Sequence, residues 1–137
     1  MSRANVEALK RGLAAYDSRD VEALLEECHD DVEWESALVK GLGGEATVYR
    51  GHGGIRDLFR EVDHAFDEFR IGFDADDISD LGDRIVASGW MRVRGRSSGA
   101  TVESPVSFVA DFRDGKAVRF RSFLDRRDAL EAAGLSE

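Results

Sequence analysis

The side chains with the strongest chemistry in this sequence are its three histidines, His29, His52 and His64, and its one cysteine, Cys28. Metal sites built from these residue types recur at short characteristic spacings, which these four do not follow. Cys28 lies in an apolar helical pattern without a motif that would activate its thiol, so we expect a buried structural role. The glycine-rich stretch 41–44 lacks the lysine and hydroxyl residue that close a phosphate-binding loop. The sequence therefore predicts no metal site and no cofactor.

A second set of side chains combines apolar bodies with polar tips. Tyr16, Trp34 and Tyr49 occupy positions that point inward in the predicted helices and strands. Ser36 and Ser122 also lie on inward faces, where a hydroxyl group can donate a hydrogen bond. Two interpretations remain open, ordinary core packing or the lining of a small-molecule pocket. The predicted pocket residues are Tyr16, Trp34, Ser36, Tyr49, Phe59, Phe108, Phe120 and Ser122.

The elements that must position these residues are mainly helices in the first half of the chain. Apolar residues recur at helical spacing from Val6 to Tyr16. Asp20 is a suitable N-cap for a second short helix, which residues 29–31 should end. Residues 32–36 alternate like a strand, and a third helix should begin near His52. The apolar stripe of that helix is predicted to comprise Ile55, Phe59, Val62, Phe66 and Phe69.

The second half of the chain predicts an antiparallel meander. Four segments rich in β-branched and aromatic residues cover 71–78, 84–94, 100–112 and 116–124. Short turns join them, and the Asp114-Gly115 pair is a strong hairpin signal. A short terminal helix is predicted over 128–133, ending at Gly134. Without a linker or repeat, residues 1–137 are expected to form a single domain.

Alternation gives the late strands an inward and an outward face. The inward residues are predicted to be Ala87, Gly89, Met91, Val93, Val106, Phe108, Ala110, Phe112, Val118, Phe120, Ser122 and Leu124. The outward face mixes aromatic residues with charges, which a fully solvated face rarely does without a use. We expect a homodimer contact there; a solvated face and a site where arginines hold an anionic ligand are the alternatives. The predicted dimer-face residues are Trp90, Arg92, Val109, Arg121 and Phe123.

Charge and composition exclude several classes of partner. The net charge of −9 argues against nucleic acid, because the phosphate backbone repels an acidic surface. No apolar run approaches the roughly 20 residues that span a bilayer, and the N-terminal residues lack a signal-peptide pattern. A single cysteine cannot form an internal disulfide, which favours a reducing compartment. We expect a cytoplasmic protein with neither a nucleic-acid nor a membrane partner.

Three stretches, residues 14–21 with 29–34, residues 49–55 and residues 114–130, resemble the nuclear transport factor 2-like superfamily. The likeness is to its SnoaL-like and ketosteroid-isomerase-like branch. It implies a cystatin-like α+β fold, in which three helices of the N-terminal half pack on the concave face of a cone-shaped, curved antiparallel sheet. It also implies a deep pocket between sheet and helices, and dimerisation through the outer face of the sheet.

The resemblance does not select one activity. Known activities on this scaffold include ketosteroid isomerisation, polyketide cyclisation, epoxide hydrolysis and dehydration, usually without a cofactor, and many members are non-catalytic. The base, tyrosine and second acid of the ketosteroid isomerases correspond here to Ser36, Gly12 and Phe108, so ketosteroid isomerisation is not expected. The residue types of the epoxide-hydrolase set occur only on the outward face, at Asp111, Arg92 and Arg121.

The sequence thus predicts a SnoaL-like protein that binds a small apolar or mixed-polarity molecule in a hydrophobic pocket. Two hypotheses remain for what it does with that molecule. One is a cofactor-independent isomerase, cyclase or hydrolase, and the other is a non-catalytic ligand-binding or dimerisation module of the same fold. An ionisable residue deep in the pocket would distinguish the first from the second.

Overall fold

A computed structural model describes residues 3–36 and 48–135 of the chain. The predicted glycine-rich loop at 41–44 lies outside these residues. The elements in chain order are α1 (Arg3–Ser18), α2 (Val21–Glu26), β1 (Cys28–Glu35), β2 (Val48–Arg50), α4 (Gly51–Ala65), β3 (Phe66–Asp80), β4 (Arg84–Gly95), β5 (Thr101–Arg113), β6 (Lys116–Phe123) and α5 (Arg126–Ala132). Asp20 caps α2 as predicted, because its carboxylate accepts a hydrogen bond from the Ala23 amide.

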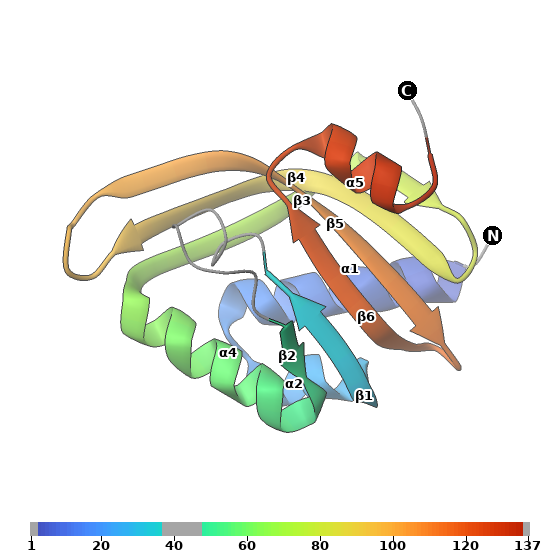
Figure 1. Ribbon diagram of the computed structural model, residues 1–137, viewed down its shortest axis with the longest axis horizontal. Coiled ribbons are helices and arrows are strands. Elements are labelled where there is room, and N and C mark those ends of the chain that lie inside the picture. The colour runs from blue at the N-terminus through green and yellow to red at the C-terminus, as the bar shows by residue number, and fades with distance from the viewer. Residues whose placement is uncertain (1–2, 37–47, 136–137) are drawn as a thin grey trace.

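The strands form one curved, open sheet in the order β2-β1-β6-β5-β4-β3. The meander from β3 to β6 is antiparallel as predicted, whereas β1 runs parallel to β6. Helices α1, α2 and α4 pack on one face of this sheet, and α5 packs on the other (Figure 1). The predicted α+β class, with helices of the N-terminal half on one face of a curved sheet, is confirmed.

The main core lies between the sheet and α1, α2 and α4. Most of the predicted inward residues are buried there, including Met91, Val106, Phe108 and Phe120. Two predictions at the end of the sheet were wrong. Ala117 enters the core in place of Val118, because an irregularity between Asp111 and Phe112 shifts the β5–β6 register. Leu124 lies beyond the end of β6 and is exposed.

Two segments differ from their predicted secondary structure. Phe66 and Phe69 are buried as expected, but they belong to β3, because α4 ends at Ala65 and Phe66 pairs with Gly95. A register shift between Phe66 and Glu68 lets both phenylalanines face the core at a spacing that imitates a helix. Residues 29–31 belong to β1, and the buried Cys28 begins this strand by pairing with Ala117.

Helix α5 covers part of the outer sheet face. Val109 is fully buried against α5, with Val86, Ala129, Leu130 and Ala133, and Phe123 packs against this second cluster. The expectation that Val109 is available to a second chain was therefore wrong. The sequence pattern could not reveal this, because α5 is short and its docking on β5 is a long-range contact.

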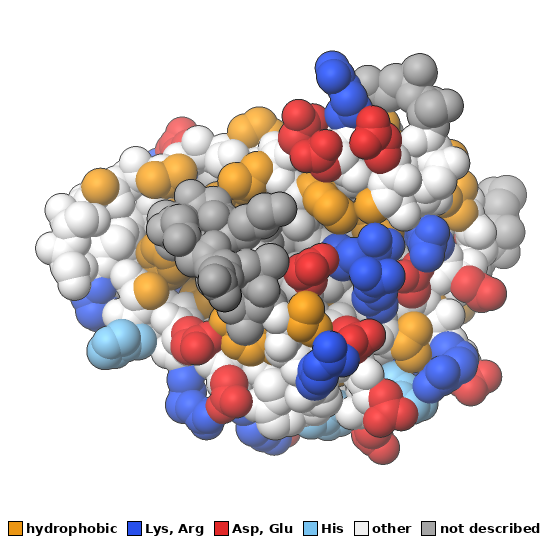
Figure 2. Space-filling model, in the orientation of Figure 1, with side chains coloured by type: hydrophobic (Ala, Val, Ile, Leu, Met, Phe, Trp, Pro, Cys, Tyr) orange, Lys and Arg blue, Asp and Glu red, His pale blue; other side chains and the backbone are white. Residues whose placement is uncertain are grey.

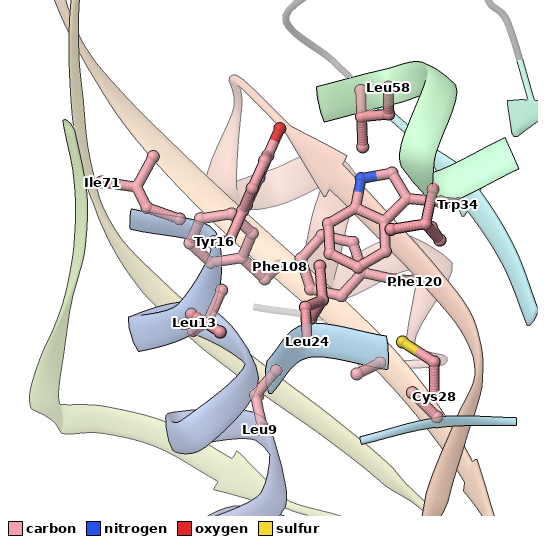
Figure 3. Close-up of a cluster of buried hydrophobic side chains, with 14 of the residues drawn as sticks. Leu9, Leu13, Tyr16, Leu24, Cys28, Trp34, Leu58, Ile71, Phe108 and Phe120 are labelled. Atoms are coloured by element: carbon pink, nitrogen blue, oxygen red, sulfur yellow. The ribbon is translucent and has the colours of Figure 1, made fainter. Parts of the chain in front are cut away.

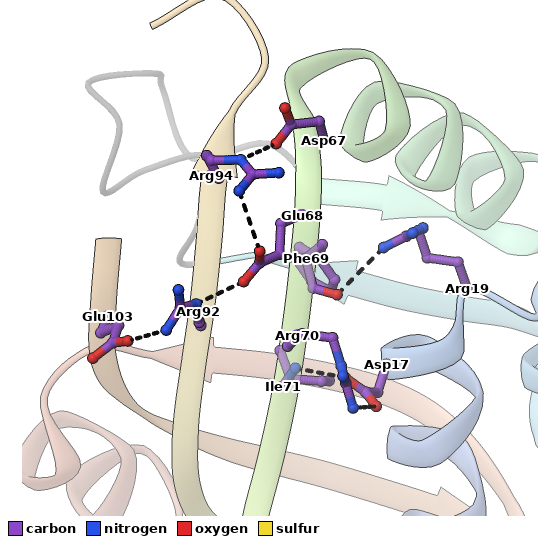
Figure 4. A network of polar contacts seen from close by, with 10 residues as sticks. All are labelled: Asp17, Arg19, Asp67, Glu68, Phe69, Arg70, Ile71, Arg92, Arg94 and Glu103. Atoms are coloured by element: carbon purple, nitrogen blue, oxygen red, sulfur yellow. Dashed lines mark hydrogen bonds and ion pairs between the residues drawn. The ribbon is translucent and has the colours of Figure 1, made fainter. Parts of the chain in front are cut away.

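An ion pair anchors the last turn of α1 to β3 (Figure 4). The Asp17 carboxylate accepts hydrogen bonds from the Arg70 guanidinium and from the Ile71 backbone amide. Arg19, just after the helix, donates to the Phe69 carbonyl oxygen. These bonds fix the end of α1, and with it the neighbouring Tyr16.

Within the described ranges, the structure has no helix that is both long and apolar enough to cross a membrane.

Candidate ligand-binding site

Five of the predicted pocket residues form one aromatic cluster in the core (Figure 3). Tyr16 contacts Trp34 edge to face at a centroid distance of 5.2 Å, and it contacts Phe59 at 5.7 Å. Trp34 stacks on Phe120 at 3.8 Å, and Phe120 contacts Phe108 at 5.5 Å. The structure therefore brings together side chains from α1, β1, α4, β5 and β6. We call these five residues the aromatic cluster.

Strand pairing explains how Trp34 reaches the middle of the cluster. It lies opposite Phe120 in the parallel β1–β6 pair and opposite Tyr49 in the antiparallel β1–β2 pair. Residues directly opposite each other share one face of a sheet, so the three rings lie side by side on the inward face. Ser122 lies opposite Phe108 on the same face and is half-buried.

The polar tips of Tyr16 and Trp34 point to the same side of the cluster, the side on which Leu58 lies (Figure 3). The Tyr16 hydroxyl forms a hydrogen bond with the side chain of Ser36, a buried residue just after β1. Trp34 is 2% exposed, and its Nε1 has no hydrogen-bond partner among the described residues. A buried donor without an acceptor is uncommon in proteins and calls for an explanation.

The ionisation of Tyr16 is strongly suppressed. Burial raises its pKa well above the usual range, the nearby Tyr49 raises it further, and the hydrogen bond with Ser36 lowers it. At neutral pH the hydroxyl is therefore protonated and can donate a hydrogen bond. It is not a base.

Tyr49 lies beside Trp34, but its hydroxyl is engaged outside the cluster. It donates a hydrogen bond to the carboxylate of Glu61 on α4. Burial first, and then this carboxylate, raise the pKa of Tyr49 to about 12. Sequence reasoning missed Glu61, and the only available signal was its position in α4, three residues after the buried Leu58. The bond holds β2 against α4 and so fixes one wall of the aromatic cluster.

The core also contains a cavity of about 20 Å³, lined by apolar side chains of α1, α2, β1, β5 and β6. Trp34, Phe120 and Cys28 contribute to its wall. This volume has room for about one water molecule, so it is too small for an organic ligand. Burial raises the pKa of Cys28 to about 12, so the thiol beside this cavity is protonated.

Carboxylates and histidines are absent from the buried polar residues that the structure describes, which are Asn5, Ser36, Ser88, Ser107 and Arg121. His52 lies at the surface, where its Nε2 is 3.2 Å from the Cys28 carbonyl oxygen. The described residues contain no group of three or more histidine, cysteine or acidic side chains arranged to hold a metal ion. Apart from Arg121, the ionisable groups buried among the described residues are the hydroxyls of Tyr16 and Tyr49 and the Cys28 thiol.

The predicted dimer-face residues do not form one exposed surface. Trp90 is 48% exposed, and Arg92 is exposed but bonded to Glu68 and Glu103 of its own chain (Figure 4). Val109 is buried under α5, Phe123 packs against it, and Arg121 is buried. Of the five, Trp90 alone presents a large apolar surface to solvent.

This arrangement, a curved open sheet with helices over an aromatic-rich inner face, defines a cystatin-like, nuclear transport factor 2-like α+β protein. The chain belongs to the SnoaL-like domain family, whose sequence model matches residues 9–120. A search of curated proteins found no match.

Several solved structures are similar over nearly the whole chain. TerC, crystallised with polyporic acid, is 28% identical with a TM-score of 0.77, and the match covers 93% of this chain and 98% of TerC. A nuclear transport factor 2-like protein of unknown function from Burkholderia pseudomallei is 25% identical with a TM-score of 0.78, covering 96% and 97%. A cystatin-fold protein from Novosphingobium aromaticivorans, 19% identical with a TM-score of 0.71 and covering 90% and 98%, shows the fold alone.

Proposed function

We propose that the protein binds a small apolar or mixed-polarity molecule against the aromatic cluster. The observation that carries the proposal is Trp34 Nε1, a buried donor that lacks an acceptor among the described residues. A buried donor left unsatisfied costs about 1–3 kcal/mol. A ligand oxygen would satisfy it, and the Tyr16 hydroxyl on the same side of the cluster offers a second donor. The aromatic side chains would have to move apart to admit the apolar body of such a ligand, because the cavity beside them holds about one water molecule.

Binding without catalysis is the version that the described core favours. An isomerase, cyclase or hydrolase would need a group that accepts a proton near neutral pH. The tyrosines have raised pKa values, and the described residues include no buried carboxylate or histidine. We therefore favour the hypothesis of a non-catalytic ligand-binding module over that of a cofactor-independent enzyme. A cytoplasmic location, favoured by the single cysteine, belongs to the same proposal.

Polyporic acid is the first ligand to test, because TerC was crystallised with it. The chain has two tryptophans, so a Trp90→Phe variant leaves Trp34 as the only indole fluorophore. We expect polyporic acid to quench this fluorescence along a saturable curve. Adding Tyr16→Phe, which removes one hydroxyl and keeps the ring, should weaken binding about fivefold, since a neutral hydrogen bond contributes about 1 kcal/mol.

The matched control is Trp34→Phe, which leaves the exposed Trp90 as the fluorophore. Free N-acetyltryptophanamide at the same ligand concentrations corrects for light absorbed by polyporic acid. Saturable quenching that is confined to Trp34 supports the proposal. A linear decrease that is equal in both variants would show that polyporic acid does not enter the core, and a range of smaller apolar acceptors would then be tested in the same way.

A homodimer remains part of the proposed function, with Trp90 at its centre. This indole lies on the outer face of β4, over Gly72 and opposite Pro105 of β5. Exposed tryptophans are enriched at protein interfaces. We expect sedimentation velocity at micromolar concentration to show a dimer, and we expect Trp90→Glu to shift the equilibrium toward monomer at least tenfold. A monomeric wild type, or a dimer unaffected by the substitution, would contradict a contact at this position.

A further inference from the structure

A second unsatisfied group lies on the opposite side of the sheet from the aromatic cluster. Arg121 of β6 has a side chain only 10% exposed, and its Nε and Nη2 atoms are buried without hydrogen-bond partners among residues 3–36 and 48–135. The nearest carboxylate oxygen in the described structure, Asp111 Oδ2, is 3.8 Å from Nη2, too far for a hydrogen bond. A guanidinium with two buried, unbonded nitrogens is costly, because burial removes water without supplying another acceptor.

The one carboxylate within reach is already engaged elsewhere. Asp111 accepts a hydrogen bond of 2.5 Å from Arg84 Nε, so one carboxylate serves two guanidinium groups. Arg119 lies opposite Asp111 in the β5–β6 pair and adds a third positive charge. Glu35 lies opposite Arg121 in the β1–β6 pair and attracts it. Glu33 lies opposite Arg119 in the same pair and is bonded to Arg50. At these paired positions four guanidinium groups therefore share three carboxylates.

The electrostatic state of Arg121 reflects this shortage of negative charge. Burial is the main cause that lowers its pKa, and repulsion from Arg119 lowers it further. The attraction of Asp111 offsets only part of this effect. The protein thus keeps a buried cation in surroundings that disfavour its charge. An anion bound beside Arg121 would offset both the cost of burial and the repulsion from Arg119.

The surface beside these residues is accessible. Basic side chains gather over β6, next to α5, on the face that Figure 2 shows. An open hollow on one side is lined by Arg84 and Asp111, with Leu81, Asp83, Phe112 and Ala133. A smaller hollow on the other side is lined by Arg119 and Glu35, with Glu33, Val48 and Phe120. Both hollows lie beside neighbours of Arg121 in the sheet and neither includes Arg121 itself, so an anion would first meet Arg84 in one hollow or Arg119 in the other.

We propose that the outer face of β5 and β6 binds a carboxylate or phosphate group between Arg84, Arg119 and Arg121. The planar guanidinium group presents a fork of donors that matches both anions in a bidentate manner. The anion can come from a free small molecule or from an acidic side chain of a second copy of the chain. The site does not depend on the aromatic cluster, because the sheet separates the two.

The test measures thermal unfolding in sodium phosphate and in sodium chloride at equal ionic strength and pH. We expect phosphate to raise the Tm of the wild-type chain by about 5 °C at tenfold excess over its Kd. Arg121→Met should abolish this rise. Arg92→Met is the matched control, because Arg92 lies on the same sheet and is already bonded to Glu68 and Glu103, so it should keep the rise. Asp111→Asn should enlarge it, since it removes the competing carboxylate.

Protein concentration distinguishes the two sources of the anion. If a second copy supplies the carboxylate, Tm and the dimer fraction rise with protein concentration in the wild type, and Arg121→Met removes that dependence while phosphate has little effect. If Arg121→Met does not fold, Arg121→Lys replaces it and should keep less than half of the rise, because lysine lacks the guanidinium fork. The proposal is overturned if neither phosphate nor protein concentration separates the wild type from these variants.

Discussion

Replacing Trp34 by alanine should lower the free energy of unfolding by about 3–5 kcal/mol, the usual cost of removing a large aromatic side chain from a packed core. Trp34 is 2% exposed, stacks on Phe120 at 3.8 Å and contacts Tyr16 edge to face. Its removal takes away apolar burial and leaves a cavity between β1 and β6. The loss should be larger when a ligand that binds at Trp34 is in the buffer, because only the wild type gains stability from it.

Trp90→Ala is a closely matched control, because it makes the same substitution at the other tryptophan of the chain. Trp90 is 48% exposed, so its replacement should cost less than about 1 kcal/mol in a monomer. Urea unfolding followed by far-ultraviolet circular dichroism measures both variants without depending on tryptophan fluorescence. Equal losses in the two variants would show that Trp34 does not have the central packing role that we assign to it.

Gly89→Ala should destabilise the protein by about 3 kcal/mol, near the upper end of the usual cost of overpacking. A Cβ atom at this position of β4 would lie 1.9 Å from the Gly72 carbonyl oxygen and 2.5 Å from the Phe73 Cα. Both contacts are with backbone, so no side chain can rotate away, and β3 must separate from β4. The position coincides with the register shift after Phe73, where β3 departs from regular pairing.

Gly53→Ala is the control for this prediction, because nothing lies within 4 Å of a Cβ atom there and the residue belongs to α4. Alanine in a helix is favoured over glycine, so this variant should gain about 0.5–1 kcal/mol. The denaturant midpoints of the two variants and the wild type measure both stability changes. A Gly89→Ala protein as stable as Gly53→Ala would mean that β3 and β4 are not held as closely as described.

Local signals account for most of the fold. The turn between β5 and β6 follows from Asp114-Gly115, whose φ angles of 54° and 78° suit the tight hairpin that this pair predicts. Alternation in β4 and β5 correctly separates core residues such as Val106 from outward ones. These features depend on neighbours in the sequence, which is why one sequence was enough to predict them.

The errors in the predicted secondary structure arise from strand pairing between residues that are distant in the sequence. Residues 29–31 look like a helix end, yet they extend β1 because Cys28 finds a partner in Ala117 at the far end of the chain. Phe66 and Phe69 have the spacing of a helix, and only the irregular pairing with β4 places them in a strand. No local pattern carries either piece of information.

The candidate site likewise combines features that local sequence predicts with features that only long-range contacts determine. Its aromatic members were predictable, since each lies on an apolar face of a recognisable element. The lack of an acceptor at Trp34 Nε1, the engagement of Tyr49 by Glu61, and the burial of Arg121 depend on how the elements meet. A sequence can thus predict which side chains face inward, but not which of their polar atoms remain unsatisfied.

The parallel pairing of β1 with β6 has a consequence for how the protein is made. A ribosome releases β1 before β6, and the stack of Trp34 on Phe120 joins these two strands. Until β6 emerges, β1 has only the three-residue β2 as a strand partner. Contacts so distant in sequence form slowly, and exposed strand edges promote aggregation in the meantime. The aromatic cluster is therefore completed only after β6 has left the ribosome.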